Sequence, residues 1–223
     1  DGGNATINGC SISLFPVRYS AMWISSLLAA TVLAAASVAQ YGNVPTQSIQ
    51  PLQLKNAKGE FRTTCTTFSI NEQRKMWGTA AHCVVQESEL GQGEVREVFI
   101  ADKPTTLMFA DVPLDIAVLR AEVSAPAIPF GGRPQVGDAV RVYGYMWGAY
   151  APTIFFGRIA NLNATADRSH YMIMDMRVGG GHSGSPILDA SGHVISVMQV
   201  SSMGFSGGAL YGYLDEMLPY WQN

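Results

Sequence analysis

The sequence predicts an all-β protein built from two six-stranded β-barrels and a short C-terminal helix. Apolar residues make up 48% of the chain, charged residues only 14%, and 23 glycines supply frequent turn signals. Short apolar runs separated by turns are typical of all-β proteins. These runs form two sets of six, divided by the Pro/Gly-rich segment APAIPFGGRP at residues 125–134. This arrangement is typical of two barrels joined by a linker.

Each barrel has its own predicted strands. The first set covers residues 49–54, 61–70, 77–79, 95–100, 105–110 and 116–120. The second set covers residues 139–145, 153–162, 171–176, 185–188, 194–201 and 209–213. Residues 213–222 are expected to form a terminal helix, which Pro219 makes irregular. We therefore expect one barrel in residues 40–124 and the other, with the helix, in residues 125–223.

Residues 1–39 form a separate region, a polar segment followed by 19 uncharged and mostly apolar residues at 21–39. Two interpretations of this run stay open. It is a secretory signal, with Ser37-Val38-Ala39 as the cleavage site, or a membrane anchor that just reaches the span of a bilayer core. The first predicts a secreted protein and the second a membrane-anchored one with membrane contact through residues 21–39. A translation start at Met22 would place residues 1–21 outside the protein.

The three cysteines are Cys10, Cys65 and Cys83, an odd number. Removal of residues 1–39 takes Cys10 away and leaves an even pair in an oxidising compartment.

Composition excludes several function classes. The net charge is −3 and no basic cluster exists to neutralise phosphates, so nucleic-acid binding is not expected. No CxxC pair is present, and His170 and His193 have no ligand cluster nearby in the sequence. We expect no metal ion and no cofactor.

Three local motifs carry candidate chemistry. In TAAHC (79–83), small residues flank His82; in PLDIAVLR (113–120), Asp115 stands at the mouth of an apolar strand; in GGGHSGSP (179–186), glycines surround Ser183. Taken singly, these would be a core histidine, a turn-capping aspartate and a glycine-rich turn. Together they supply a base, an orienting carboxylate and a nucleophile, with glycines that let backbone N–H groups converge on an oxyanion.

The TAAHC, DIAVL and GxSGxP patterns, in this order, resemble the chymotrypsin-like (trypsin-fold) serine endopeptidases over about residues 48–222. The resemblance implies two perpendicular antiparallel barrels with the site in the cleft between them. It implies that Ser183 attacks, His82 transfers the proton and Asp115 orients the imidazole. It also implies an oxyanion hole from the N–H groups of Gly181 and Ser183, and a Cys65–Cys83 disulfide.

Two departures narrow the resemblance. His182 stands where the animal digestive members carry Asp, and Ser185 replaces their second glycine. In both features the sequence resembles members of the bacterial and viral branch, which includes glutamyl endopeptidases. Activation by an ion pair with a freed N-terminus is therefore not expected.

Substrate contacts are also inferred from the resemblance. The expected binding residues are Arg177, Gly180, Met198, Gln199, Val200 and Ser201. Arg177 stands where a trypsin-like specificity would need Asp, so we expect a preference for small or apolar residues. An acidic preference through Arg177 is the alternative. The aromatic run at 143–150 is expected to pack in the second barrel, with the lining of substrate subsites as the alternative.

The sequence thus predicts a secreted, monomeric serine endopeptidase that acts on protein or peptide substrates. One alternative is a membrane-tethered protease that processes a polyprotein, which residues 21–39 would anchor. The other is a catalytically silent binding module on the same fold.

Overall fold

The chain divides into two compact units, residues 1–40 and 41–223. The computed structural model describes residues 6–7, 10–11, 44–87, 93–147, 149, 151–166, 169–202, 205–208 and 211–221. In the first unit, β1 (Thr6–Ile7) pairs with β2 (Cys10–Ser11). The predicted signal or anchor at residues 21–39 lies outside the described residues. Within the described ranges, no helix has both the length and the apolar character needed to cross a membrane.

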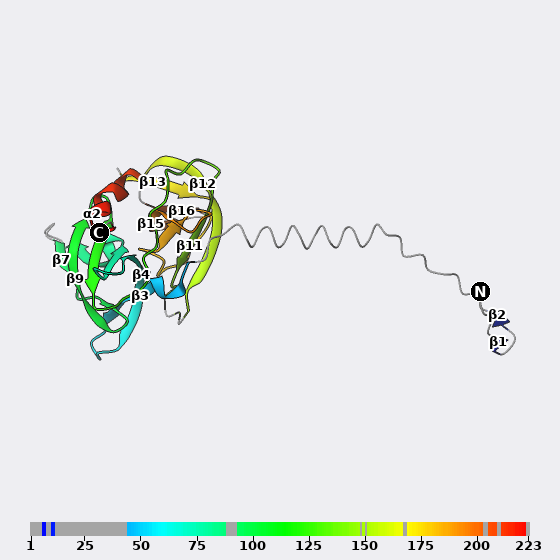
Figure 1. Ribbon diagram of the computed structural model, residues 1–223, viewed down its shortest axis with the longest axis horizontal. Helices are drawn as coiled ribbons and strands as arrows, with labels where there is room; N and C mark the ends of the chain where they lie inside the picture. Colours follow the sequence, from blue (N-terminus) through cyan, green and yellow to red (C-terminus); the bar gives the residue numbers. More distant parts are fainter. Residues whose placement is uncertain are drawn as a thin grey trace. The chain divides into compact units, whose positions relative to one another are not determined.

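The first barrel closes in the order β10-β5-β4-β3-β8-β9, with every pair antiparallel. Figure 1 labels its strands β3, β4 and β9. Its strands are β3 (Ile49–Lys55), β4 (Phe61–Asn71), β5 (Met76–Thr79), β8 (Phe99–Ile100), β9 (Lys103–Asp111) and β10 (Ile116–Ala121). Phe68, Trp77 and Ile116 fill the interior and are fully buried. A separate sheet pairs β6 (Val85–Glu87) with β7 (Gly93–Val95), and short 3-10 turns are η1 (Thr46–Ser48) and η2 (Ala81–Cys83).

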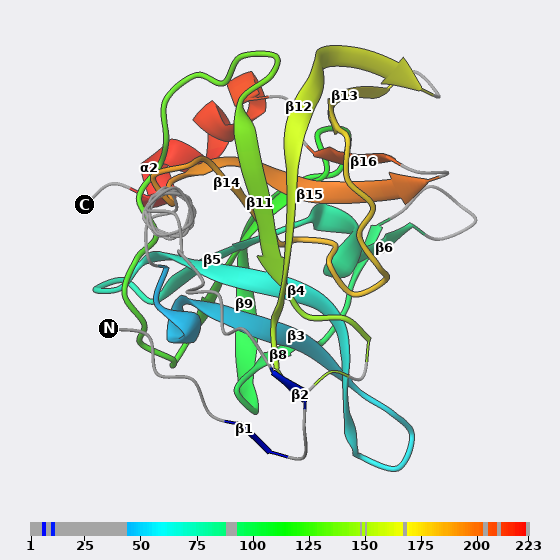
Figure 2. The same ribbon diagram turned by 90° about the vertical axis from the view of Figure 1, so that its right-hand side faces the viewer.

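The second barrel closes in the order β11-β12-β13-β16-β15-β14, again antiparallel throughout. Its strands are β11 (Ala139–Gly144), β12 (Thr153–Ala166), β13 (Ser169–Met174), β14 (Pro186–Leu188), β15 (Val194–Ser202) and β16 (Phe205–Gly208). Figure 2 shows β12, β13, β15 and β16 above β3, β4 and β9 of the first barrel. The predicted fold class, two six-stranded barrels, is confirmed. The predicted domain boundaries stay a prediction.

Two predicted strands were wrong in detail. The run 95–100 is split between β7 and β8, which belong to different sheets, because exposed Glu97 interrupts the apolar pattern before the buried pair Phe99–Ile100. The last strand is β16 instead of residues 209–213. Glycine is needed there, since a Cβ on Gly208 would lie 2.3 Å from Ile187 Cδ1.

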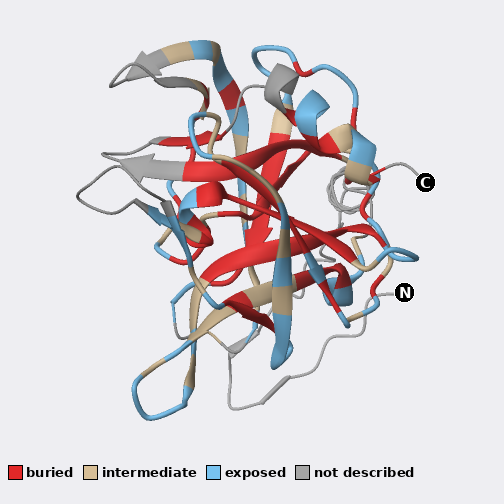
Figure 3. Cartoon of the chain, turned by 90° about the vertical axis from the view of Figure 1, so that its left-hand side faces the viewer, coloured by how far each residue is buried: buried red, intermediate tan, exposed pale blue. Residues whose placement is uncertain are grey.

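The C-terminal segment ties the two barrels together. It forms the 3-10 turn η3 (Tyr211–Met217) and then the helix α2 (Leu218–Trp221). The Trp221 ring lies 5.8 Å from that of Phe68 in β4, and its Nε1 donates to Ile128 O at 2.8 Å. Figure 3 shows the buried strands running through the centre of the molecule, with exposed segments at its edge. The segment that follows the second barrel therefore packs on the first.

Candidate active site

His82 lies in η2, directly after β5, where its backbone is held tightly. The next residue, Cys83, forms a disulfide with Cys65 in β4, with a Cα–Cα distance of 6.1 Å. Ala80 and Ala81 are fully buried, so the turn packs closely against the barrel. The His82 side chain itself is 46% exposed. A fixed backbone thus presents an accessible imidazole.

Asp115 lies in the turn between β9 and β10 and holds His82 at two points. Its Oδ2 lies 2.8 Å from His82 Nδ1, and its Oδ1 accepts a hydrogen bond from the His82 backbone N–H at 2.8 Å. A carboxylate only accepts hydrogen bonds, so the Nδ1 nitrogen carries the proton. In the neutral ring, Nε2 is then the free acceptor.

Ser183 lies in the loop between β13 and β14, at the junction of the barrels. Its carbonyl accepts a hydrogen bond from Thr66 N in β4 at 2.8 Å. The N–H of the next residue, Gly184, donates to Met198 O in β15 at 2.8 Å. A Cβ on Gly184 would lie 3.0 Å from Ala80 N, two residues before His82. The serine loop therefore packs against the segment that carries the histidine.

Gly181 needs its glycine for conformation and space. Its φ is +95°, and a Cβ there would lie 2.6 Å from Trp147 N and from Tyr145 O. The Gly180 carbonyl accepts a hydrogen bond from Trp147 N at 3.0 Å. In a trans peptide the N–H of Gly181 points opposite to that carbonyl, hence away from Trp147. The loop conformation thus depends on close backbone contact with residues 145–147.

A comparison with protein-family models matches residues 65–197 to a family described as the trypsin-like peptidase domain. The match spans more than half of the chain and contains His82, Asp115 and Ser183. The chain belongs to the trypsin-like peptidase family. A search of curated proteins found no match. The matched segment ends one residue before Met198, so Gln199, Val200 and Ser201 lie outside it.

In this trypsin-like peptidase, the residue before Ser183 is a buried neutral histidine. His182 is fully buried, with its ring edge against Phe155 at a centroid distance of 5.1 Å. Its Nδ1 lies 3.1 Å from Gly179 O and its Nε2 lies 2.9 Å from Thr153 Oγ1. Burial lowers the pKa of His182, and the hydrogen bond to the Gly179 carbonyl opposes this shift in part. The ring therefore braces the loop without a charge.

The predicted substrate residues lie in different environments. Arg177 and Gly180 are exposed, whereas the Met198 side chain is buried in the core of the second barrel. The Gln199 side chain reaches the first barrel and donates to the carbonyls of Leu114 and Asp115. Val200 and Ser201 belong to β15, and their side chains lie outside the described part of the structure. A role in substrate binding stays a prediction for all six residues.

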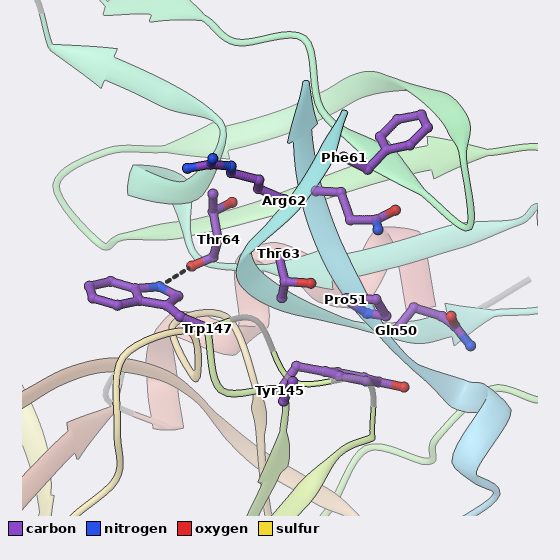
Figure 4. Close-up of a pocket in the computed structure, with 10 residues that line it drawn as sticks. Gln50, Pro51, Phe61, Arg62, Thr63, Thr64, Tyr145 and Trp147 are labelled. Carbon is purple, nitrogen blue, oxygen red and sulfur yellow. Dashed lines mark hydrogen bonds between the residues drawn. The ribbon is translucent and has the colours of Figure 1, made fainter. Parts of the chain in front are cut away.

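Two hollows of the peptidase border this site. The larger, about 780 Å³, separates the β3–β4 hairpin from the segment after β11 (Figure 4). In it, Trp147 Nε1 donates to Thr64 O at 2.9 Å, and a Cβ on Gly180 would lie 2.9 Å from the Trp147 ring. The smaller, about 370 Å³, is lined by His82, Val85, Gln86, Arg96, Val112 and Asp115. The smaller hollow therefore lies beside His82 and Asp115, and the larger one approaches the Ser183 loop through the contact of Trp147 with Gly180.

No pattern in the sequence indicates that Thr66 joins the Gly181 carbonyl to the Tyr145 amide. It is fully buried; its hydroxyl donates to Gly181 O at 3.0 Å and accepts from Tyr145 N at 2.9 Å. A threonine inside a β-strand has no local pattern that would predict these two hydrogen bonds. Trp147, which contacts Thr64 and Gly180, belongs to the aromatic run at 143–150, and that run was the pattern in the sequence that could have pointed to it.

A metal site is not supported by the described residues. The group there with suitable donor spacing is Cys65, His82 and Cys83, and the disulfide removes both thiolates.

Proposed function

We propose that this trypsin-like peptidase is an active serine endopeptidase with Ser183 as nucleophile, His82 as general base and Asp115 as the orienting carboxylate. The observation that carries the proposal is the double hydrogen bond from His82 to Asp115, through the backbone N–H and Nδ1. This bond selects the tautomer whose Nε2 can accept a proton.

The mechanism follows from these roles. Ser183 Oγ attacks the scissile carbonyl while His82 Nε2 takes its proton. The tetrahedral intermediate collapses to an acyl-enzyme as His82 gives that proton to the leaving amine. A water molecule, deprotonated by His82, then attacks the ester. The bond to Ser183 Oγ breaks, the acid is released, and His82 returns the proton to Ser183 Oγ. Asp115 stabilises the imidazolium in both steps.

The oxyanion that forms in each step needs donors, and we assign them to the N–H groups of Gly181 and Ser183. The hydrogen bond from Trp147 N to Gly180 O supports this assignment, because it turns the Gly181 N–H away from residue 147. Each such donor contributes about 3 kcal/mol to the transition state.

Substrate binding extends from this centre. We propose that an extended peptide lies along β15 and that the groove beside Trp147 takes the residues next to the cut. A small or apolar residue is the proposed preference, with an acidic residue read by Arg177 as the alternative. The uncharged His182 supports a place in the bacterial and viral branch, because no N-terminal ion pair is needed to brace the loop.

The disulfide supports an extracytoplasmic location, where such bonds persist. We therefore propose that the protein is secreted. The apolar run at residues 21–39 favours a membrane-tethered processing protease as the second candidate. N-terminal sequencing of the mature protein separates the two, because retention of residues 21–39 excludes a cleaved signal.

A serine-directed phosphonate probe tests the enzymatic activity. We expect the folded protein to be labelled and Ser183→Ala, as the matched control, to remain unlabelled. Asp115→Asn should fold normally and lower kcat about 10⁴-fold. If the folded wild-type protein resists labelling and cleaves no member of a random peptide library, the silent binding module is the better interpretation.

A further inference from the structure

Gln199 joins the second barrel to the turn that carries Asp115. Its Nε2 donates to Leu114 O at 2.6 Å and to Asp115 O at 3.1 Å. A primary amide nitrogen carries two N–H donors, and two consecutive carbonyls use both. The residue is only 9% exposed, so water competes little for these bonds.

The turn that Gln199 contacts has an unusual backbone. Asp115 has φ of +52°, in the left-handed region that residues with a Cβ rarely adopt. The amides of the turn bond within it, Leu114 N to Asp111 Oδ1 at 2.8 Å and Asp115 N to Val112 O at 3.1 Å. The carbonyls of residues 114 and 115 bond instead to Gln199. Strained backbone at a functional site persists where its surroundings hold it in place.

The same stretch of β15 also holds the nucleophile loop. At Met198, the backbone accepts from Gly184 N and donates to Ser185 O, both at 2.8 Å. One residue later, the Gln199 side chain holds the Asp115 turn. Two adjacent residues of one strand thereby set the position of the loop around Ser183 and of the carboxylate that binds His82.

We propose that Gln199 is a positioning residue, which holds the left-handed Asp115 turn so that its carboxylate meets both donors of His82. This inference rests on the proposed function. The Gln199 side chain binds the Asp115 turn and no reacting atom, so in this role it acts through Asp115. Loss of its two bonds lets the turn relax and misdirects the imidazole, and a displacement of about 1 Å costs about 100-fold in rate.

Two variants test the proposal. Gln199→Met keeps the length of the side chain and its neutral charge but has no donor. Gln199→Glu keeps the shape but turns acceptors towards two carbonyl oxygens. The control is Gln135→Glu, the same change at an exposed position in the segment before β11. We expect both Gln199 variants to lower kcat about 100-fold with KM within about twofold, and the control to behave as wild type.

A spectroscopic readout separates positioning from general stability. The hydrogen-bonded Nδ1 proton of His82 should give a downfield proton resonance, assigned by its absence in His82→Gln. We expect this resonance in the wild type and its loss in both Gln199 variants, with near-UV circular dichroism unchanged. Variants that keep both the resonance and kcat overturn the proposal.

Two further outcomes are informative. If the variants unfold, hydrogen exchange of the Gln199 amide in the wild type decides: slow exchange of both Nε2 protons supports the inference, and fast exchange overturns it. If the wild type shows the His82 resonance but is never labelled by the phosphonate, the proposed function fails while the positioning role of Gln199 is still measured.

Discussion

Removing the Cys65–Cys83 disulfide is expected to lower the free energy of unfolding by about 3 kcal/mol. The bond closes a loop with a sequence separation of 18 residues, and the entropy that such a crosslink removes from the unfolded chain amounts to about 3 kcal/mol. The change to test is the double variant Cys65→Ala/Cys83→Ala. Alanine is preferable to serine because both positions are buried, where an unpartnered hydroxyl would add its own cost.

Urea unfolding followed by tryptophan fluorescence measures this effect. Trp77 is fully buried in the first barrel, so its emission reports on the barrel that contains the disulfide. With a slope of about 2 kcal/mol per molar urea, a loss of about 3 kcal/mol moves the midpoint down by about 1.5 M.

Two controls isolate the crosslink. Reductant should bring the wild type to the midpoint of the double variant and should leave the double variant unchanged. Cys10→Ala, in the unit of residues 1–40, should not shift the transition of residues 41–223. A double variant whose midpoint stays within about 0.3 M of the oxidised wild type would refute the argument from loop entropy.

Three further predictions concern the loop around Ser183. Burial lowers the pKa of His182, so below about pH 6.5 the unfolded chain binds a proton there that the folded chain does not. The free energy of unfolding should therefore fall as the pH drops from about 6.5 to the folded-state pKa, by up to about 1.4 kcal/mol per pH unit. Urea unfolding between pH 7 and 5 should show a shallower pH dependence in His182→Gln, and equal slopes would contradict this. Gly184→Ala should lower the free energy of unfolding by at least about 2 kcal/mol, since φ is +79° and the new Cβ would lie 2.4 Å from Thr66 O. The control is Gly132→Ala, where a Cβ meets nothing within 4 Å, and its thermal unfolding should match that of the wild type. Trp147→Ala should raise KM for peptides several-fold in steady-state assays, and an unchanged KM would remove Trp147 from the substrate groove. The melting temperature should stay within about 2 °C of the wild type, because the residue is 71% exposed.

Much of the barrel architecture could be predicted because its strands are short apolar runs with turns between them. Local pattern could not predict which strands pair. Glu97 separates two strands of different sheets. Gly208 pairs with β13 and β15, and it has to be glycine because Ile187 lies where its side chain would be.

The residues of the candidate site also fall into two groups, those that local sequence patterns single out and those that they do not. His82, Asp115 and Ser183 stand out because each lies in a local motif whose neighbours are small, apolar or glycine. Thr66 and Gln199 do not, because their contacts join residues 115 and 85 positions apart. Side-chain hydrogen bonds across such separations leave no periodic trace in the sequence.

The sequence by itself determined the fold class, the residues that could serve as base, carboxylate and nucleophile, and the cysteines available to pair. These follow from hydrophobic periodicity and from residue types within a few positions of one another. Only the tertiary structure decided which nitrogen of His82 faces Asp115, how His182 is kept neutral and which strand supports both the Ser183 loop and the Asp115 turn. Those features depend on distances between residues far apart in the sequence, which are set only when each barrel closes and the two barrels pack together.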